Sequence, residues 1–309
     1  MSGIDDQTAL PSQRQRGKGR FFLGFVLGVV VGALLAISYR GSSSRPAAAP
    51  ELMGSAGRAG STTESSMDEV LQIAREALEH MYQNVDDYTA TLVQQESTSG
   101  QLGEAQEMSI KVHCRHRGPA RDDSEPFRVY LRFERPASVA GREVIFAEDK
   151  YDGKLVVHEG GFLGLLTVYL DPTGLVAMRG QRYPIYEIGL TNLVKKLIEK
   201  GEEDRTNPNV TVTITRDWEL EGQRCDLIVV RRSQPNGQPD DFSRAEICFD
   251  RERHLPLRYA AYGWPPGPLE TADMADAPLL ESYTYLNVRT NVGLTESDFD
   301  HKNPDYQFR

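Results

Sequence analysis

Runs of alternating apolar and polar residues dominate the chain from residue 88 onward and restrict its fold more than any other feature. Tyr88, Ala90 and Leu92 alternate with polar neighbours, and later runs repeat this period of two. Such alternation is typical of half-buried β-strands. The later runs lie at 108–114, 127–133, 143–146, 154–158, 165–170, 210–218, 226–231, 245–249, 257–262 and 283–289. We therefore predict about eleven strands.

Two segments break this series with apolar residues at helical spacing. Ser66 and Glu69 form a capping-box pattern ahead of an apolar stripe that runs from Val70 to Met81. A second helix is predicted over 191–200, with Thr191 as its cap and Gly201 closing it. Strands and helices do not alternate as a parallel sheet requires. The predicted class is therefore α+β, with a large curved antiparallel sheet packed against two helices.

Residues 21–39 read FFLGFVLGVVVGALLAISY, without a charge or a proline. At about 1.5 Å per residue, a helix of this length reaches about 28 Å and crosses a hydrocarbon core. Four basic residues precede the run closely and two follow it, which leaves the N-terminus in the cytoplasm. The sequence therefore predicts an N-terminal transmembrane helix and an exported C-terminal part.

A cleaved signal peptide is the alternative, with Ala36, Ile37 and Ser38 as a small-residue cleavage site. The apolar run is longer than a usual signal core, which favours an uncleaved anchor. Gly24, Gly28 and Gly32 share one helix face, where two copies could pair, although glycine is common in membrane spans.

The predicted order is a cytoplasmic tail (1–20), a transmembrane anchor (21–39), a flexible linker (40–66) and an exported domain (67–309). The linker contains GSSSRPAAAP and GSAGRAGSTTESS, which are too poor in apolar residues to form a core. Residues 1–40 carry five basic and two acidic side chains, so a total of −10 leaves −13 for the rest. An acidic exported part argues against nucleic acid as a partner.

Cys225 and Cys248 flank the turn Asn236-Gly237 symmetrically, as neighbours in a hairpin would. Oxidation is compatible with export, but alternation with different neighbours suggests that the two side chains point to opposite faces. The pattern leaves open whether they form a disulfide.

Three groups of residues are candidates for chemistry. His113, Cys114 and His116 include metal-binding types, but alternation in a strand directs them to different faces, and Cys114 continues an apolar row. The glycine-rich stretch 160–164 lacks the lysine of a phosphate loop. Glu143, Glu148, Asp149 and Asp152 lie beside a predicted turn at Asp152-Gly153. We predict no catalytic residue, metal or cofactor, and no enzyme activity.

Aromatic residues concentrate near the C-terminus, in the segments 256–268 and 281–288. The side chains concerned are Tyr259, Tyr262, Trp264, Tyr283 and Tyr285. Rings with one wet and one apolar end suit an interface or the mouth of a ligand site, and ordinary strands also carry them.

Four segments resemble the uncharacterised bacterial domain-of-unknown-function family 1571 and, more distantly, the LolA/LolB-like lipoprotein-carrier superfamily. They are DDYTATLVQQE (86–96), YLRFERPASVAGREVIF (130–146), RYPIYEIGLTNLVKKLIE (182–199) and the closing LLESYTYLNVRTNVGL with Asp298 and Phe299. The resemblance covers about residues 67–300. It implies an incomplete barrel of about eleven strands, with an apolar concave face that holds acyl chains under helices.

The expected function is a membrane-anchored binding protein of the bacterial inner membrane, with its domain in the periplasm. Its ligand would be an acyl chain of a lipid or lipoprotein in an apolar half-barrel cavity. The residues predicted to line that cavity are Phe127, Val129, Leu131, Phe133, Val144 and Phe146. The alternative is a non-catalytic structural or regulatory envelope protein that binds a protein partner.

Overall fold

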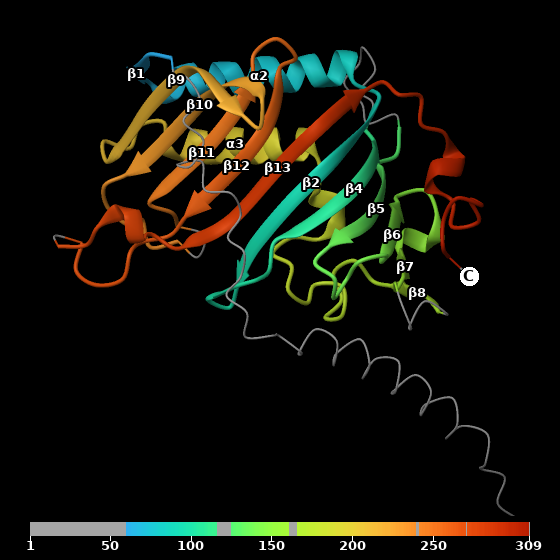
Figure 1. Cartoon of the computed structure of the whole chain (residues 1–309). Coiled ribbons are helices and arrows are strands. Elements are labelled where there is room, and N and C mark those ends of the chain that lie inside the picture. The colour runs from blue at the N-terminus through green and yellow to red at the C-terminus, as the bar shows by residue number, and fades with distance from the viewer. Residues whose placement is uncertain (1–59, 116–124, 161–165, 239–240, 270, 309) are drawn as a thin grey trace, which may run out of the picture. The chain divides into compact units, whose positions relative to one another are not determined.

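A computed structural model describes residues 60–115, 125–160, 166–238, 241–269 and 271–308 of the chain. These residues form one curved antiparallel sheet in the order β1-β9-β10-β11-β12-β13-β2-β4-β5-β6-β7-β8, with β3 paired to β2 (Figure 1). In the described part of the chain, β1 and β8 are the two ends of this order, so the sheet is open. The predicted α+β class, with a large antiparallel sheet and two helices, is confirmed.

All eleven predicted strands are present, within a residue or a few of the expected bounds. They are β2 (Asp87–Thr98), β4 (Gln106–His113), β5 (Arg128–Arg135), β6 (Glu143–Ala147), β7 (Leu155–His158), β8 (Thr167–Leu170), β9 (Val210–Leu220), β10 (Gln223–Arg232), β11 (Arg244–Asp250), β12 (Leu255–Tyr262) and β13 (Leu279–Thr290). The sequence did not predict β1 (Thr62–Ser65) or β3 (Gln101–Leu102).

Strand β1 lies inside the segment that we expected to be a linker. It pairs with β9, with Thr62 opposite Thr215, and the hydroxyl oxygens of these two threonines lie 2.8 Å apart. These last linker residues therefore belong to the folded domain, because backbone pairing and a cross-strand hydroxyl contact hold them on the sheet. The remainder of the predicted linker, residues 40–59, lies outside the described residues.

Helix α2 (Met67–Asn84) begins as predicted, with the Ser66 side chain accepting a hydrogen bond from the Glu69 backbone N–H at 3.2 Å. Helix α3 (Leu190–Asp204) begins and ends differently from the prediction. Its cap is Gly189 rather than Thr191, and Gly201 lies inside the helix. Gly201 faces α2 so closely that an added Cβ would lie 2.8 Å from Leu71 Cδ2. The glycine therefore permits a close helix–helix contact and does not end the helix.

Both helices lie against one face of the sheet, behind it in Figure 1, and we call this the concave face. Two clusters of buried residues fill the space between the helices and the sheet. A third cluster lies on the other face, where Phe299 packs against Tyr130, Ile145 and Val156. Short 3-10 helices complete the described elements: η2 (Tyr151–Gly153), η4 (Ile185–Glu187), η5 (Met274–Asp276) and η6 (Glu296–Phe299).

A buried ion-pair group joins the end of α3 to the sheet. The guanidinium of Arg232 on β10 donates to both carboxylate oxygens of Asp204 at 2.9 to 3.2 Å, and to Asp241 at 2.9 Å. It also lies 4.0 Å from the ring centroid of Phe242. The side chains of Arg232 and Asp204 are 2% and 4% exposed. Because the charges are removed from water, each depends on the other for compensation.

The faces expected for Cys225 and Cys248 were wrong. Cys248 pairs with Leu227 across β10 and β11, and Cys225 lies two positions from Leu227, so both side chains lie on the same face. Both are free, buried thiols. The hydrogen bond with Cys225, together with burial, raises the pKa of the Cys248 thiol. The sequence argument failed because it compared neighbours along each strand and not the residues opposite each other.

Candidate functional site

The six residues predicted to line a cavity lie together on the concave face. Phe127 precedes β5, Val129, Leu131 and Phe133 lie on β5, and Val144 and Phe146 lie on β6. All six belong to one cluster and are between 0% and 7% exposed. The structure thus brings them together and packs each one closely. Their role in lining a ligand cavity stays a prediction.

Residues 171–189, which connect β8 to α3, lie over part of this apolar face, and we call them the cover. Ile185, Tyr186 and Ile188 pack against the cluster that contains the six residues. The ring centroids of Tyr186 and Phe146 lie 6.1 Å apart. Apart from the short η4, the cover contains no helix or strand, so the sheet hydrogen bonds do not hold it in place.

A polar cluster attaches the cover to β2 and β13. The backbone N–H of Arg182 donates to Glu96 at 2.8 Å, and its guanidinium forms an ion pair with Glu281 at 3.2 Å. The hydroxyl of Tyr183 donates to Glu281 at 3.3 Å. Tyr283 donates to Glu281 at 3.2 Å and also to Glu96. Two carboxylates, each less than a tenth exposed, therefore contact Arg182, one through its guanidinium and the other through its backbone N–H.

Burial raises the pKa of Glu96, and the hydrogen bonds from Tyr283 and Arg182 only partly oppose this shift. Burial, together with the neighbouring Glu281 and Glu96, likewise raises the pKa of Tyr283. The concave face therefore carries a carboxyl group that holds its proton to a higher pH than an exposed glutamate does.

This shift predicts a pH dependence of stability. Because Glu96 binds its proton more tightly in the folded state, the free energy of unfolding should fall as pH rises from the ordinary glutamate pKa through the raised one. Urea unfolding of the wild type and of Glu96→Gln across this range measures the effect. The difference between the two proteins should change with pH in that direction, and a constant difference would contradict it.

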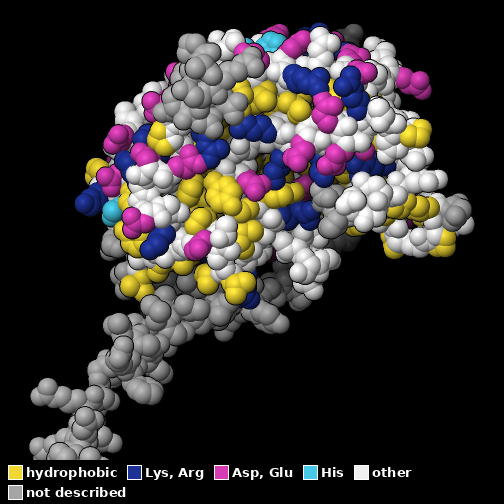
Figure 2. All heavy atoms as spheres, turned by 180° about the vertical axis from the view of Figure 1, so that it is seen from behind, with side chains coloured by type: hydrophobic (Ala, Val, Ile, Leu, Met, Phe, Trp, Pro, Cys, Tyr) yellow, Lys and Arg dark blue, Asp and Glu magenta, His cyan; other side chains and the backbone are white. Residues whose placement is uncertain are grey.

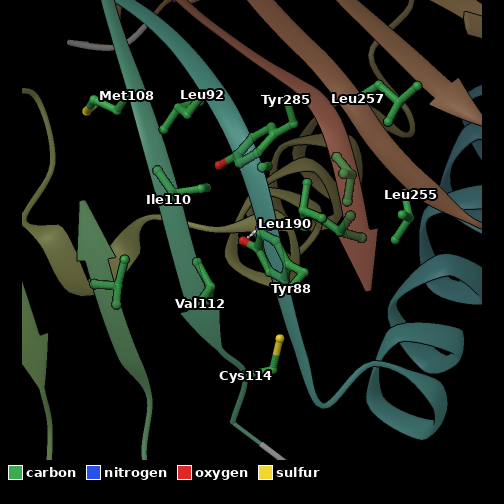
Figure 3. Packing of buried hydrophobic residues seen from close by; sticks show 14 of the residues in the cluster. Tyr88, Leu92, Met108, Ile110, Val112, Cys114, Leu190, Leu255, Leu257 and Tyr285 are labelled. Carbon is green, nitrogen blue, oxygen red and sulfur yellow. Dashed lines mark hydrogen bonds between the residues drawn. The ribbon is translucent and has the colours of Figure 1, made fainter. Parts of the chain in front are cut away.

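Two buried tyrosines attach the other end of the cover, where α3 begins (Figure 3). The hydroxyl of Tyr88 accepts a hydrogen bond from the backbone N–H of Leu190 at 3.1 Å. The hydroxyl of Tyr285 interacts with the backbone of Gly189, and burial raises the pKa of this tyrosine. Tyrosine hydroxyls on β2 and β13 thus take the place of the side-chain cap that Gly189 lacks.

A pocket opens beside this attachment, between the first turn of α3 and the apolar ends of β4 and β5. Val112, Phe127 and Ile188 form its apolar wall, and Asn192 and Lys195 of α3 also line it. Its free interior has room for about one water molecule. Phe127 belongs both to this pocket and to the predicted cavity lining.

The other polar candidates have structural contacts. His113 Nδ1 lies 3.3 Å from the carbonyl oxygen of Pro126, and Cys114 is buried in the core, where burial raises its pKa to about 12. His116 and most of the stretch 160–164 lie outside the described residues. Among the residues that are described, no group of three or more ligand-type side chains could hold a metal ion.

The four carboxylates near the turn at Asp152-Gly153 each have different contacts. Glu143 is buried and accepts from the Tyr130 hydroxyl at 2.7 Å, while Asp149 pairs with Arg128. Glu148 accepts from the backbone N–H of Phe127 at 2.8 Å. Asp152 lies in the turn between β6 and β7, with a φ of 54°. These four side chains therefore do not form one site.

The aromatic residues near the C-terminus have different surroundings. Tyr285 is buried in the core and Tyr283 belongs to the polar cluster, whereas Tyr259 packs beside the second core cluster. Trp264 donates from its indole N–H to Asp241 at 2.9 Å, and the Tyr262 ring lies 4.0 Å from the Arg244 guanidinium. Tyr283 shares Glu96 and Glu281 with the cover, and Tyr285 contacts the backbone of Gly189.

Sequence reasoning missed the residues that hold the cover. Gln94 and Glu96 follow the apolar Leu92 on the same face of β2, and both are buried. The side chain of Gln94 also donates a hydrogen bond to Gln181 of the cover at 3.1 Å. In the sequence, these two polar residues continue the apolar row of β2, and this change from apolar to polar was the signal that could have identified them. A polar position inside a buried row requires a partner, and the cover supplies it.

In the part of the chain that the structure describes, no helix is long and apolar enough to cross a membrane. The predicted span 21–39 lies outside the described residues.

Solved structures with some similarity to this chain come from several bacteria. A DUF1329 family protein from Desulfovibrio piger is 13% identical, with 77% of this chain and 98% of that chain covered and a TM-score of 0.36. The MucA/MucB complex of Pseudomonas aeruginosa contains a chain that is 14% identical, with 75% of this chain and 60% of that chain covered and a TM-score of 0.41. A LolA superfamily protein from Nitrosomonas europaea is 8% identical, with 74% of this chain and 97% of that chain covered and a TM-score of 0.28. All three TM-scores are low, and the sheet order of this chain itself defines its fold.

No curated protein matches the sequence. The family model for proteins of unknown function named DUF1571 matches residues 85–308, which include the sheet from β2 to β13, the cover and α3. The chain therefore belongs to the DUF1571 family.

Proposed function

We propose that this protein is a membrane-anchored periplasmic binding protein that takes an acyl chain of a lipid or lipoprotein onto the concave face. The observation that carries the proposal is the combination of six clustered apolar residues with a cover that has little regular structure of its own. The acyl chain would replace cover side chains such as Ile185 and Tyr186 against Phe146 and its neighbours. Apolar concave sites of this kind suit a hydrocarbon ligand.

The attachments of the cover are compatible with opening. One end depends on a few charge-assisted hydrogen bonds at Arg182, and the other on tyrosine hydroxyls at Gly189 and Leu190. Releasing such contacts exposes polar groups that water can solvate, whereas unpairing a strand of the sheet would cost many backbone hydrogen bonds. The cover therefore moves before the sheet does.

Native mass spectrometry tests the proposal. The full chain is purified from its host, and the domain is released at a protease site inserted in residues 40–59. We expect a bound species with the mass of a lipid, and its loss in Leu131→Trp, which fills the concave face. Arg132→Trp is the matched control, because Arg132 is exposed on the opposite face of β5. A domain that is consistently free of lipid and binds no added acyl probe would refute the proposal.

A protein partner is the second candidate, favoured by the exposed apolar side chains of the cover. Leu175 is 94% exposed and Val176 is 39% exposed. Figure 2 shows the molecule from the side opposite to Figure 1, where apolar side chains reach the surface in several groups between charged ones. If Leu175→Glu abolishes capture of an envelope protein while Leu131→Trp does not, the partner is recognised through this surface and the acyl site is not required.

A further inference from the structure

Two cysteines on neighbouring strands, Cys225 of β10 and Cys248 of β11, lie side by side on one face of the sheet. Cys248 is opposite Leu227, and Cys225 lies two positions before Leu227 on the same strand. The two thiols are hydrogen-bonded to each other and are 4% and 0% exposed. Cys114 follows β4, which is separated from β11 by the strands β12, β13 and β2. The fold therefore brings two thiols together and keeps the third apart.

A buried arginine without a carboxylate partner lies beside this pair. Arg258 of β12 is directly opposite Cys248, so the two side chains point to the same face. Arg258 is 3% exposed, and its guanidinium donates to the hydroxyl oxygens of Ser282 and Thr284 at 3.3 and 2.9 Å. Within the described ranges, its Nε has no acceptor and no carboxylate pairs with it. A buried cation is unfavourable unless a negative group compensates it.

Arg258 is placed to compensate a thiolate at Cys248. The hydrogen bond with Cys225 and burial raise the pKa of the Cys248 thiol, and the guanidinium of Arg258 opposes this shift. Glu246, on the same face of β11, also raises the pKa, but its carboxylate forms an ion pair with Arg244 at 3.2 Å. The thiolate is the nucleophile of thiol–disulfide exchange, so a cation beside one of two paired thiols favours this reaction.

We propose that Cys225 and Cys248 form a redox-active pair that an exported thiol–disulfide oxidoreductase converts to a disulfide. The inference goes beyond the proposed function and does not depend on an acyl ligand. Cys225 is the third residue of β10, and the pairing of β10 with β9 is irregular between Cys225 and Leu227. A ladder that is interrupted beside a turn opens locally at low cost, so the oxidant reaches Cys225 first.

The reaction has two exchange steps. The thiolate of Cys225 attacks the disulfide of the oxidoreductase, which gives a mixed disulfide and one leaving thiolate. The thiolate of Cys248, beside Arg258, then attacks the Cys225 sulfur and releases the second thiolate of the oxidoreductase. The two thiols of this chain are oxidised, the disulfide of the oxidoreductase is reduced to two thiols, and the two protons pass to its leaving thiolates.

Thiol trapping of the full chain in its host tests the proposal. Cells are precipitated with acid to stop exchange, the protein is dissolved in denaturant with N-ethylmaleimide, and its peptides are identified by mass spectrometry. We expect Cys225 and Cys248 in one pair of disulfide-linked peptides and Cys114 in its alkylated form. Alkylation of all three cysteines, or a disulfide that includes Cys114, would overturn the proposal.

Oxidised glutathione tests the role of Arg258 on the reduced full chain. In the wild type, Cys248 should resolve the glutathione mixed disulfide on Cys225 by intramolecular attack. In Arg258→Gln we expect this step to be about threefold slower, because the thiolate fraction falls while the more basic thiolate that remains is intrinsically more nucleophilic. Arg258→Lys should restore the rate, since it keeps the positive charge.

Arg224→Gln is the matched control. Arg224 precedes Cys225 on β10, is exposed and points to the opposite face, so its replacement makes the same change of charge away from the thiols. Urea unfolding of each variant shows whether the fold is retained. Equal rates in the wild type and in Arg258→Gln, or equal slowing in Arg224→Gln, would overturn the role assigned to Arg258.

Discussion

Replacing Asp204 by alanine should lower the free energy of unfolding of this domain by about 3–5 kcal/mol. The substitution removes the carboxylate that receives four hydrogen-bond contacts from Arg232 and leaves Asp241 as the remaining anion beside that guanidinium. The Arg232 side chain is 2% exposed, so water does not replace the lost partner. A buried charge without its partner is among the largest single-residue effects on stability.

Chemical denaturation of the wild type and of Asp204→Ala measures this loss. Glu203→Ala is the control, because the neighbouring Glu203 forms an ion pair with Lys200 in which the two side chains are 50% and 36% exposed. Exposed pairs of this kind contribute about 0–1 kcal/mol. If both substitutions cost the same, the ion pair of Arg232 and Asp204 does not stabilise the junction of α3 with the sheet.

Replacing Arg182 by methionine should release the cover. Glu281 would lose its ion pair with the guanidinium, while the backbone hydrogen bond to Glu96 and the apolar contacts of the cover would remain. We expect hydrogen exchange at the amides of Glu187 and Ile188 to become about 10–100 times faster, which corresponds to about 1.5–3 kcal/mol. Both amides donate within the cover, at 2.9 and 3.1 Å, and so report its local opening.

Arg179→Met provides the comparison, because Arg179 lies in the same cover and is exposed. Its replacement changes the charge and side-chain length in the same way without touching the polar cluster. Exchange in the sheet, for example at Leu131, should stay unchanged in both variants, which separates opening of the cover from global unfolding. Equal exchange in the wild type and in Arg182→Met would mean that apolar packing alone holds the cover.

The sequence predicted the sheet well because each long strand carries its own alternating pattern. It missed β1 and β3 because these strands are short and polar: β1 reads TTES, and β3 contains only Gln101 and Leu102. Neither strand has an apolar row, so only pairing with β9 and β2 identifies them. The same limitation explains Cys225 and Cys248, whose relation depends on register between strands.

Only the apolar part of the candidate site could be predicted from the sequence. The apolar residues of β5 and β6 follow from alternation, and the structure places them on one face. The cover, its polar cluster and the pocket at α3 depend on contacts between residues far apart in the chain. Tyr283 and Glu96, for example, are 187 positions apart. The start of α3 was predicted one residue or two late for a related reason, since tyrosine hydroxyls from two strands replace a local side-chain cap.

Strand β13 pairs with β12 on one side and with β2 on the other, so it joins the two parts of the sheet. It is also the last strand along the chain. During synthesis the strands β2 to β8 can pair in sequence order, but β2 finds its second neighbour only when residues 279–290 have emerged. Glu281, Tyr283 and Tyr285 arrive with this strand, so neither attachment of the cover is complete earlier. Such late, long-range pairing slows folding and leaves the apolar face accessible to chaperones or to lipid while the chain is incomplete.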